Sequence, residues 1–417
     1  MSQTCTDGAT STLADAVFRM GKPMRRAMLH MEVDTRRRVE RLRDAARTAP
    51  TGVMEATGVV YVFRHDDVRQ LLHDQRLTEV GFAALDLLDV ADEPLRSWYG
   101  ALLSTTTGLT DHRHRHLVAT AFGTISAERI RHRAALSASA AIAPLLGDGG
   151  DLVAALHMVP VAVMCEVLGI PAALVPAFAA WVDDLGPVFG MLTSDQVAPA
   201  MAAFDPLITY IGEVVADREH SPQDDLISAL IHAEIDGDVL TRAETIATVL
   251  LLLASGHDAT GSQIGCSLFT LLQRNDIVRL AIAEPDLVPS IVAETIRLEP
   301  CADGVPRRVA APLDICGEPQ AVGSLVVLCT LTAHRDPSAW TDADELRPRR
   351  FMTAATPELL TFGAGAHHCL GAALARVTLT EAIRATIAHM PILLVDPDEI
   401  RWTTTVGRCP EILPVMM

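Results

Sequence analysis

Residues 361–376 read TFGAGAHHCLGAALAR, and this stretch decides how the rest of the sequence is interpreted. It is a glycine-rich turn followed by residues that favour a helix, which we expect to begin near Cys369. A cysteine at a helix N-terminus meets unpaired backbone N–H groups and the positive end of the helix dipole, and both stabilise a thiolate. Gly363 and Gly365 allow tight turns that bring main-chain N–H groups to the sulfur, and Gly371 lets a flat group lie against the helix. The segment therefore predicts one exposed sulfur ligand for a metal.

Two other interpretations of this segment fail on spacing. A phosphate-binding glycine loop of the dinucleotide type needs a glycine where the sequence has His368. A zinc site made of His367, His368 and Cys369 would require three adjacent residues to converge tetrahedrally, with no second ligand cluster nearby. Cys369 acting alone is the interpretation that remains.

The net charge and the distribution of apolar residues argue against nucleic acid and membranes as partners. The 417 residues carry a formal net charge of -18, which disfavours binding to nucleic acid or to an anionic membrane. The first 20 residues lack the basic head, apolar core and cleavage site of a secretory signal, so we expect a cytoplasmic protein. The longest apolar run, residues 246–254, is shorter than the ~20 residues that span a bilayer, and we expect no membrane anchor.

The pattern of apolar residues predicts a mainly α-helical protein with small β-sheets, an α+β fold. Apolar residues recur at helical spacing, whereas strand-like runs are short and lie at 59–63, at 324–329 and in the C-terminal tail. No repeat, low-complexity block or linker divides the sequence, so we expect one domain over 1–417, in which residues 1–20 are candidates for disorder. The eight cysteines are scattered, and apart from Cys369 we interpret them as small buried apolar residues.

One long helix is predicted from its N-terminal signal. Thr241 and Glu244 have the spacing of a capping box and precede an apolar stretch that continues to about Gln273, which corresponds to a helix roughly 50 Å long. Its centre is polar for a buried helix, because residues 255–262 read SGHDATGS. Glycine and hydroxyl residues weaken or bend a helix centre, so either this face meets solvent or the departure has a function.

The segment FGAGAHHCLG resembles the haem-binding signature of cytochromes P450, and every fixed position of that signature is filled. The resemblance implies the P450 fold, a single triangular unit with a long central helix over the haem. It places the family's thiolate ligand on Cys369, its propionate-binding basic residue on His367, and the aromatic residue that packs against the loop on Phe362.

Other segments resemble the same family in the expected order. Glu294 and Arg297 have the family's Glu-x-x-Arg spacing, which puts both charges on one helix face for a buried ion pair. The segment RRVA resembles the strand whose arginine binds a haem propionate, and it implies Arg308 for that role. Matches also lie at 60–72, 164–171, 224–241, 332–340 and 347–351, so the resemblance covers almost the whole chain. We therefore expect no fused reductase.

The sequence departs from the family pattern in the centre of the long helix. The family usually has an acid followed by threonine over the iron, whereas this chain has Asp258 followed by Ala259. An acid with a hydroxyl or water chain supplies the protons for O–O cleavage, so the missing hydroxyl should weaken that relay. Three explanations stay open: Thr260 or Ser255 organises the water, the substrate supplies a hydroxyl, or the reaction is not an ordinary hydroxylation.

A second departure lies in residues 110–122, TDHRHRHLVATAF, where the family's His-x-x-x-Arg binds a propionate. Arg115 keeps the arginine, but Asp111 stands where histidine is common, and a carboxylate would repel a propionate. We therefore expect Asp111 to point elsewhere or to pair with a neighbouring arginine. A metal site formed by His112 and His116 at i,i+4 is geometrically possible.

The resemblance implies non-covalently bound haem b, delivery of two electrons by a ferredoxin and its NAD(P)H-dependent reductase, and insertion of one atom of O2 into an organic substrate. Apolar residues at 78–110 and 172–218 predict an apolar, small to medium-sized substrate. Expected pocket residues are Ala254, Ala259, Asp303, Val305 and Val406. Oxidative coupling or ring closure with the same cofactor, and a haem-thiolate binding protein without turnover, are the alternatives.

The resemblance also gives candidates for the ferredoxin-docking surface. Arg349, Arg350 and Arg376 lie on the cysteine side of the chain and could attract an acidic partner. Internal salt bridges are an equally good interpretation of these three residues.

Overall fold

A computed structural model describes residues 35–54, 59–80, 109–189, 194–403 and 408–417. Residues 1–20, most of the 78–110 segment and Val406 therefore lie outside the described residues, and so do the side chains of Asp111 and His112. The expectations for them stay predictions.

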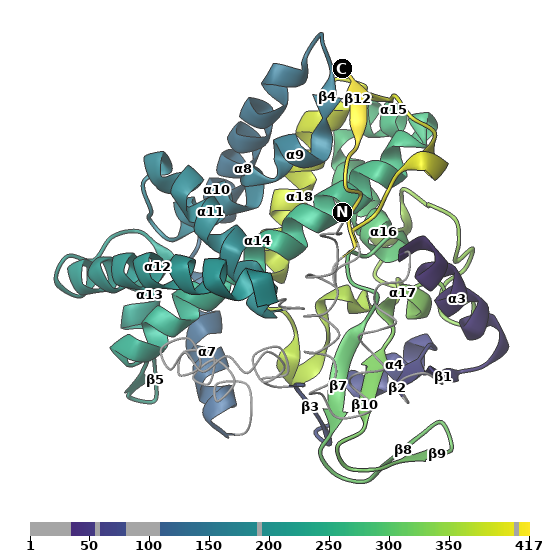
Figure 1. The fold of residues 1–417 in the computed structure, drawn as a ribbon, viewed down its shortest axis with the longest axis horizontal. Helices are drawn as coiled ribbons and strands as arrows, with labels where there is room; N and C mark the ends of the chain where they lie inside the picture. The colour runs from purple at the N-terminus through teal and green to yellow at the C-terminus, as the bar shows by residue number, and fades with distance from the viewer. Residues whose placement is uncertain (1–34, 55–58, 81–108, 190–193, 404–407) are drawn as a thin grey trace, which may run out of the picture.

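Helix α14 (Arg242–Leu272) crosses the centre of the molecule, and its ends are those predicted from the sequence (Figure 1). The Thr241 hydroxyl accepts a hydrogen bond from the backbone N–H of Glu244 at 3.2 Å, and the Glu244 carboxylate accepts one from the Thr241 N–H at 2.7 Å. This capping box satisfies two backbone donors that a helix start leaves unpaired. The helix ends at Gln273, as expected.

The other helices surround α14, and most lie on its left and upper sides in Figure 1. Helices α8, α10, α14 and α18 pack against one another and bury a large apolar core that includes Leu117, Val161, Leu250 and Leu374. The other α-helices among the described residues are α3 (Thr35–Thr48), α4 (His65–Leu72), α7 (Leu109–Gly123), α8 (Ala127–Ile142), α9 (Leu152–Leu156), α10 (Met158–Val167), α11 (Val175–Leu185), α12 (Ser194–His220), α13 (Leu226–His232), α15 (Asn275–Ala283), α16 (Val288–Leu298), α17 (Thr330–Ala333) and α18 (Ala372–Ile387).

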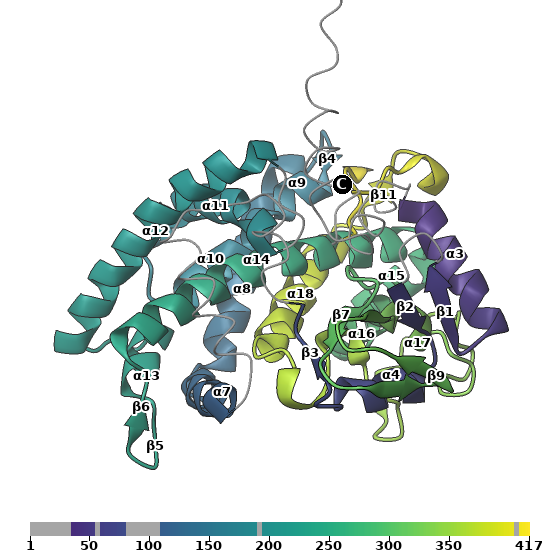
Figure 2. The same ribbon diagram turned by 60° about the horizontal axis from the view of Figure 1, so that its bottom comes forward.

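The main sheet lies at the opposite side of the molecule from α12 and α13 (Figure 2). Its order is β1-β2-β10-β7-β3, in which only β2 and β10 are parallel among the described strands. The strands are β1 (Thr51–Met54), β2 (Val59–Val62), β3 (Leu77–Thr78), β7 (Val305–Val309) and β10 (Leu325–Leu328). The strands predicted at 59–63 and 324–329 are therefore confirmed as β2 and β10.

Three smaller sheets complete the description. The chain's end forms β12 (Pro414–Met416), which lies between β11 (Ile392–Leu393) and β4 (Gly150–Asp151) and confirms the predicted C-terminal strand. The hairpins are β5 (Glu234–Ile235) with β6 (Asp238–Val239), and β8 (Leu313–Ile315) with β9 (Glu318–Gln320). The fold is mainly helical with small sheets, as predicted, and its outline in Figure 1 is roughly triangular. Among the described residues, no helix is both long and apolar enough to cross a membrane.

Candidate active site

The loop before α18 holds Cys369 by backbone hydrogen bonds. The Cys369 N–H donates to the carbonyl of Phe362 at 2.8 Å, and the Gly363 N–H donates to Leu360 O at 2.9 Å. Gly363 and Gly365 have φ values of 70° and 65°, in the left-handed region that favours glycine. The sequence placed the helix start near Cys369, but α18 begins at Ala372 because residues 365–367 form a separate 3₁₀ turn.

Opposing effects act on the Cys369 thiol. Burial raises the pKa of the thiol, whereas the Gly371 N–H and the positive charges of Arg115 and Arg376 lower it. The effect of burial is the largest, so the net result is a raised pKa. The predicted N–H contact is thus present, but it does not by itself make the sulfur a thiolate. A bound metal ion deprotonates a coordinating thiol outright, so the charge of the metal is the missing contribution.

Cys369 borders a cavity of about 420 Å³ between the cysteine loop and α14. The volume lies within the range of small-molecule sites in proteins. Phe362, Gly363, His367 and Gly371 line it together with Cys369, so these predicted cofactor residues meet at one place. A Cβ added at Gly371 would lie 3.9 Å from the Cys369 sulfur.

A second hollow of about 640 Å³ lies elsewhere, beside Trp340 and Arg347. Neither cysteine nor histidine is among its lining residues. Of these two cavities, the one at Cys369 has the chemistry of a metal cofactor site.

Helix α14 forms the wall opposite Cys369. Two of the predicted catalytic residues, Ser255 and Thr260, line the cavity, and so does Ala259. Asp258 does not line it, although it was predicted to be catalytic there. Ala254 was predicted to be a pocket residue, but it is 2% exposed and packs in the core behind the helix. The pocket prediction for Ala254 is wrong, because 254 and 258 lie on the face of α14 turned from the cavity. The catalytic role of Asp258 stays a prediction.

Strand β7 brings Arg307 to the cavity instead of Arg308. Arg307 is 5% exposed and lines the cavity, whereas Arg308 is exposed on the other face of the strand. Successive side chains of a strand point to opposite faces, so a shift of one residue reverses the assignment. Arg308 was the wrong one of two adjacent arginines. Val305 lies two residues before Arg307 and lines the cavity, as predicted.

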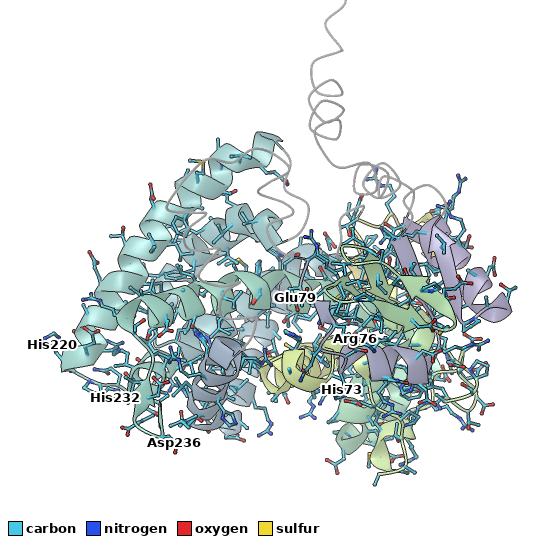
Figure 3. All side chains as sticks on the ribbon, turned by 90° about the horizontal axis from the view of Figure 1, so that it is seen from below. His73, Arg76, Glu79, His220, His232 and Asp236 are labelled. Atoms are coloured by element: carbon cyan, nitrogen blue, oxygen red, sulfur yellow. The ribbon has the colours of Figure 1, made fainter. Side chains whose placement is uncertain are left out.

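Glu79 shows that Arg307 and His367 converge on one place. The Glu79 carboxylate lies 3.2 Å from the Arg307 guanidinium and 3.5 Å from His367 Nδ1. Burial lowers the pKa of Arg307, while the charge of Glu79 raises it. In Figure 3, His73, Arg76 and Glu79 follow one another toward the middle of the molecule. The Arg307 guanidinium and the His367 imidazole therefore form a cradle for a carboxylate at the edge of the cavity.

Asp303 was predicted to be a pocket residue, but the structure places it elsewhere. Its carboxylate accepts a hydrogen bond from Arg38 of α3 at 2.7 Å, and it does not line the cavity. Burial raises the pKa of Asp303, and Arg38 opposes the shift. The residue fastens α3 to the sheet side of the molecule.

Glu294 and Arg297 form the predicted buried ion pair, and both side chains are fully buried. Arg350 also donates to the Glu294 carboxylate, at 2.8 Å. Arg297 donates to the carbonyls of His334 at 2.7 Å and Ala343 at 2.5 Å, so the pair connects α16 to the segment that precedes the cysteine loop.

Arg115 of α7 contacts the cysteine loop. Its guanidinium donates to His368 O, and its charge favours the Cys369 thiolate, but it does not line the cavity. Its neighbour Arg113 pairs with Glu244 and with Asp238. Arg113 is thereby engaged with other acids on the side away from the cysteine loop.

The three arginines proposed for ferredoxin docking all have partners within the chain. Arg350 is buried against Glu294, and Arg349 pairs with Glu284 at 2.7 Å. Arg376 lies 4.8 Å from the centre of the Phe362 ring, in a cation–π contact. The interpretation as internal salt bridges is confirmed for Arg349 and Arg350, although Arg349 stays exposed, whereas Arg376 has a cation–π contact instead.

Sequence reasoning missed several cavity residues, among them Arg307, Glu79, Gln263 and Cys301. Gln263 donates to Glu299 O at 3.0 Å and accepts from the Cys301 N–H at 2.8 Å, which joins α14 to the chain after α16. Its position was available from helical spacing, because it follows Ala259 by four residues. Glu79 had no signal in the sequence.

Comparison with known proteins agrees with this geometry. The family model described as "Cytochrome P450" matches residues 177–399. Mycinamicin IV hydroxylase/epoxidase of Micromonospora griseorubida is 33% identical over 366 residues, which are 85% of this chain and 88% of that protein. Nocardicin C N-oxygenase of Nocardia uniformis subsp. tsuyamanensis is 32% identical over 363 residues, with the same coverage. The crystal structure of CalO2 superposes with a TM-score of 0.82 at 26% identity, covering 92% of this chain and 96% of that one.

Proposed function

The chain belongs to the cytochrome P450 family, and we propose that Cys369 ligates the iron of its haem b in the cavity beneath α14. It is a haem-thiolate monooxygenase of natural-product metabolism, like the hydroxylases and oxygenases that it resembles. The observation that carries the ligand assignment is the thiol of Cys369 facing the hydroxyl-bearing turn of α14 across one cavity. We also propose that residues 1–417 fold as a single domain.

The described residues fit haem b. Cys369, on the loop before α18, borders a largely apolar cavity, which suits a porphyrin ring. Arg307 and His367 already converge on the carboxylate of Glu79, so they can bind a haem propionate once Glu79 turns away. Arg307 therefore takes the role that the sequence analysis gave to Arg308.

When bound, haem with a thiolate ligand supplies the activation of O2 and the insertion of one oxygen atom into the substrate. The residues of α14 supply protons and position water. The Ser255 hydroxyl donates to Leu251 O at 2.6 Å, so its oxygen is free to accept a hydrogen bond from a water molecule in the cavity. Thr260, five residues further along α14, also lines the cavity and carries a second hydroxyl. We propose that these two hydroxyls, aided by a hydroxyl of the substrate, replace the one missing at Ala259.

The substrate we propose is an apolar organic molecule of small to medium size. Phe122, Val163, Met164 and Leu252 provide apolar walls on the α14 side of the cavity. Hydrocarbon surface buried there contributes most of the binding energy, and the few hydroxyls fix the orientation.

We propose a ferredoxin and an NAD(P)H-dependent reductase as the electron donors, and the cytoplasm as the compartment. The seven cysteines among the described residues are all unpaired, which agrees with a reducing environment. Arg349, exposed beside Glu284, is the candidate that stays accessible to an acidic partner.

The test is the absorption spectrum of the dithionite-reduced protein under carbon monoxide. A strongly red-shifted Soret band is expected for the wild type and is expected to vanish in Cys369→Ala. Cys316→Ala is the matched control, since Cys316 is exposed and borders no part of the cavity. An unchanged band in Cys369→Ala would refute the ligand assignment.

A second experiment identifies the reaction. Titration with apolar metabolites should shift the spin state with one class of compound, and turnover under ¹⁸O2 should then label the product. Coupled or cyclised products without ¹⁸O would instead establish the oxidative-coupling reaction, and ligand binding with no turnover would establish the binding protein.

A further inference from the structure

Three side chains from separate helices meet on the side of α14 away from the haem cavity. His257 lies on α14, His157 lies between α9 and α10, and Asp183 lies near the end of α11. Figure 1 shows α10 and α11 beside α14, where these helices contact one another. None of the three residues lines the cavity or takes part in the proposed oxygenation.

Their potential ligand atoms converge closely. Nε2 of His257 lies 2.8 Å from an Asp183 oxygen, and Nε2 of His157 lies 3.0 Å from the same oxygen. The two Nε2 atoms are 3.3 Å apart, and the ring planes are inclined by 70°. Three ligands of a tetrahedral ion at ~2.05 Å are about 3.3 Å from one another, so small side-chain movements would accommodate an ion.

We propose that His157, Asp183 and His257 form a binding site for a divalent transition-metal ion, with Zn²⁺ as the best-matched probe. Two imidazole nitrogens and one carboxylate oxygen are a donor set that suits zinc and its neighbours in the first transition series. Mg²⁺ and Ca²⁺ prefer oxygen ligands and are disfavoured.

Exposure gives the site an entrance. The side chain of His257 is 2% exposed, whereas those of His157 and Asp183 are 42% and 44% exposed. An ion can therefore reach the cluster from solvent and keep a water molecule as its fourth ligand.

The surroundings set the expected affinity. Nδ1 of His257 is buried and has no hydrogen-bond partner among the described residues. Metal-binding histidines normally donate this second nitrogen to a partner, and loss of such a partner costs 10–100-fold in affinity. We expect a dissociation constant in the micromolar range, not the much tighter binding of a closed structural zinc site.

An ion at this position would join α11 and the α9–α10 junction to the active-site turn. His257 is followed by Asp258 and Ala259, and Ala259 borders the cavity. Metal binding would thus restrain α11 against α14 without contacting substrate or haem.

The experiment is equilibrium dialysis of the tag-free, haem-loaded enzyme against Zn²⁺ from about 0.1 to 200 µM, with bound metal measured by atomic emission. Wild type is expected to bind one equivalent with a micromolar dissociation constant. Asp183→Asn should weaken this binding at least tenfold, whereas Asp184→Asn, the same change at the next residue of α11, should leave it unchanged.

A second matched pair tests the imidazoles. His157→Ala should also weaken binding at least tenfold, while His220→Ala, at the exposed end of α12 (Figure 3), should not. Equal zinc binding by all four variants, or no uptake by wild type over this range, would overturn the proposal. Both results are independent of the spectrum that tests Cys369, so each inference can fail alone.

Discussion

Replacing Arg297 by methionine tests whether the buried charge network supports the cysteine loop. Arg297 is completely buried and donates to the Glu294 carboxylate through Nε and Nη2, the latter at 3.2 Å. It also donates to three backbone carbonyls, those of His334, Ala343 and Glu345. Methionine has a similar length but no donors, so the substitution removes these hydrogen bonds without leaving a large void.

The expected loss in the free energy of unfolding depends on which hydrogen-bonding groups Arg297→Met leaves unpaired. Glu294 keeps two donors at 2.8 Å, the Arg350 side chain and the Arg347 N–H, so its charge is not left without a counterion. The carbonyls of His334 and Ala343 lose their side-chain donor, whereas Glu345 O keeps the Arg350 guanidinium at 3.4 Å. Each buried group left unsatisfied costs about 1–3 kcal/mol. Breaking a buried ion pair costs about 3–5 kcal/mol, and we expect a loss in that range for the free energy of unfolding.

Urea unfolding followed by far-UV circular dichroism measures this loss. With a slope of about 3 kcal/mol per M for a chain of this size, the midpoint should fall by about 1–1.7 M. The control is Arg349→Met, which removes an Arg–Glu pair of 2.7 Å whose side chains are 60% and 44% exposed. That pair should contribute less than about 1 kcal/mol. Equal midpoints for the two variants would show that burial does not set the value of these pairs.

Three further changes have outcomes that the structure specifies. Gly365→Ala should destabilise the protein by about 1–3 kcal/mol and lower its haem content, because φ of this residue is 65° and the new Cβ would lie 2.7 Å from His73 Nδ1. Adding His73→Ala should recover only the part of the loss that is due to this contact. Ala259→Thr should raise the ratio of product formed to NAD(P)H consumed, because residue 259 lines the cavity and the new side chain restores the hydroxyl that the family usually has there. A lower ratio would instead favour proton delivery through Thr260 or the substrate. Burial holds the pKa of His334 well below its ordinary value of 6.5, and its Nε2 accepts a hydrogen bond from the Leu360 N–H at 2.8 Å, so the neutral ring stabilises the fold above pH ~6.5 and this contribution is lost as the pH falls. Between pH 6 and 5 the free energy of unfolding should decline more steeply in wild type than in His334→Gln, by up to about 1.4 kcal/mol per pH unit. Parallel slopes for the two proteins would contradict this reasoning.

Elements whose conformation depends on residues close together in the sequence could be predicted from the sequence alone. The capping box at Thr241 and Glu244 predicted the start of α14, and the β-branched runs predicted β2 and β10. The glycine-rich loop predicted that Cys369 follows tight turns just before a helix, because the conformation of those turns depends on glycines within the loop itself.

Orientation of individual side chains was harder to predict, for two different reasons. The choice between Arg307 and Arg308 depends on the register of β7 against β10 and β3, and no residue within RRVA determines which face is buried. For α14 the information was available. Residues 252, 255, 256, 259, 260 and 263 line the cavity at the i, i+3, i+4, i+7 spacing of one helical face, which excludes 254 and 258. The family pattern favoured Asp258, and helical geometry places it outside the cavity.

The two faces of this turn of α14 divide the groups that can carry protons. Ser255 and Thr260 supply hydroxyls on the cavity face, where Ala259 supplies none. His257 contacts Asp183 and His157 on the opposite face, which solvent reaches, and Asp258 is exposed there. A proton that starts on the outer face must therefore pass through water beside the helix backbone before it reaches the cavity hydroxyls. Since the Cys301 thiol donates to the Ala259 carbonyl at 3.5 Å, that oxygen already has a protein partner in addition to the helix. A hydroxyl on the bound substrate is the group that we propose completes this path together with Ser255 and Thr260, so a substrate analogue without that hydroxyl should lower the ratio of product to NAD(P)H consumed.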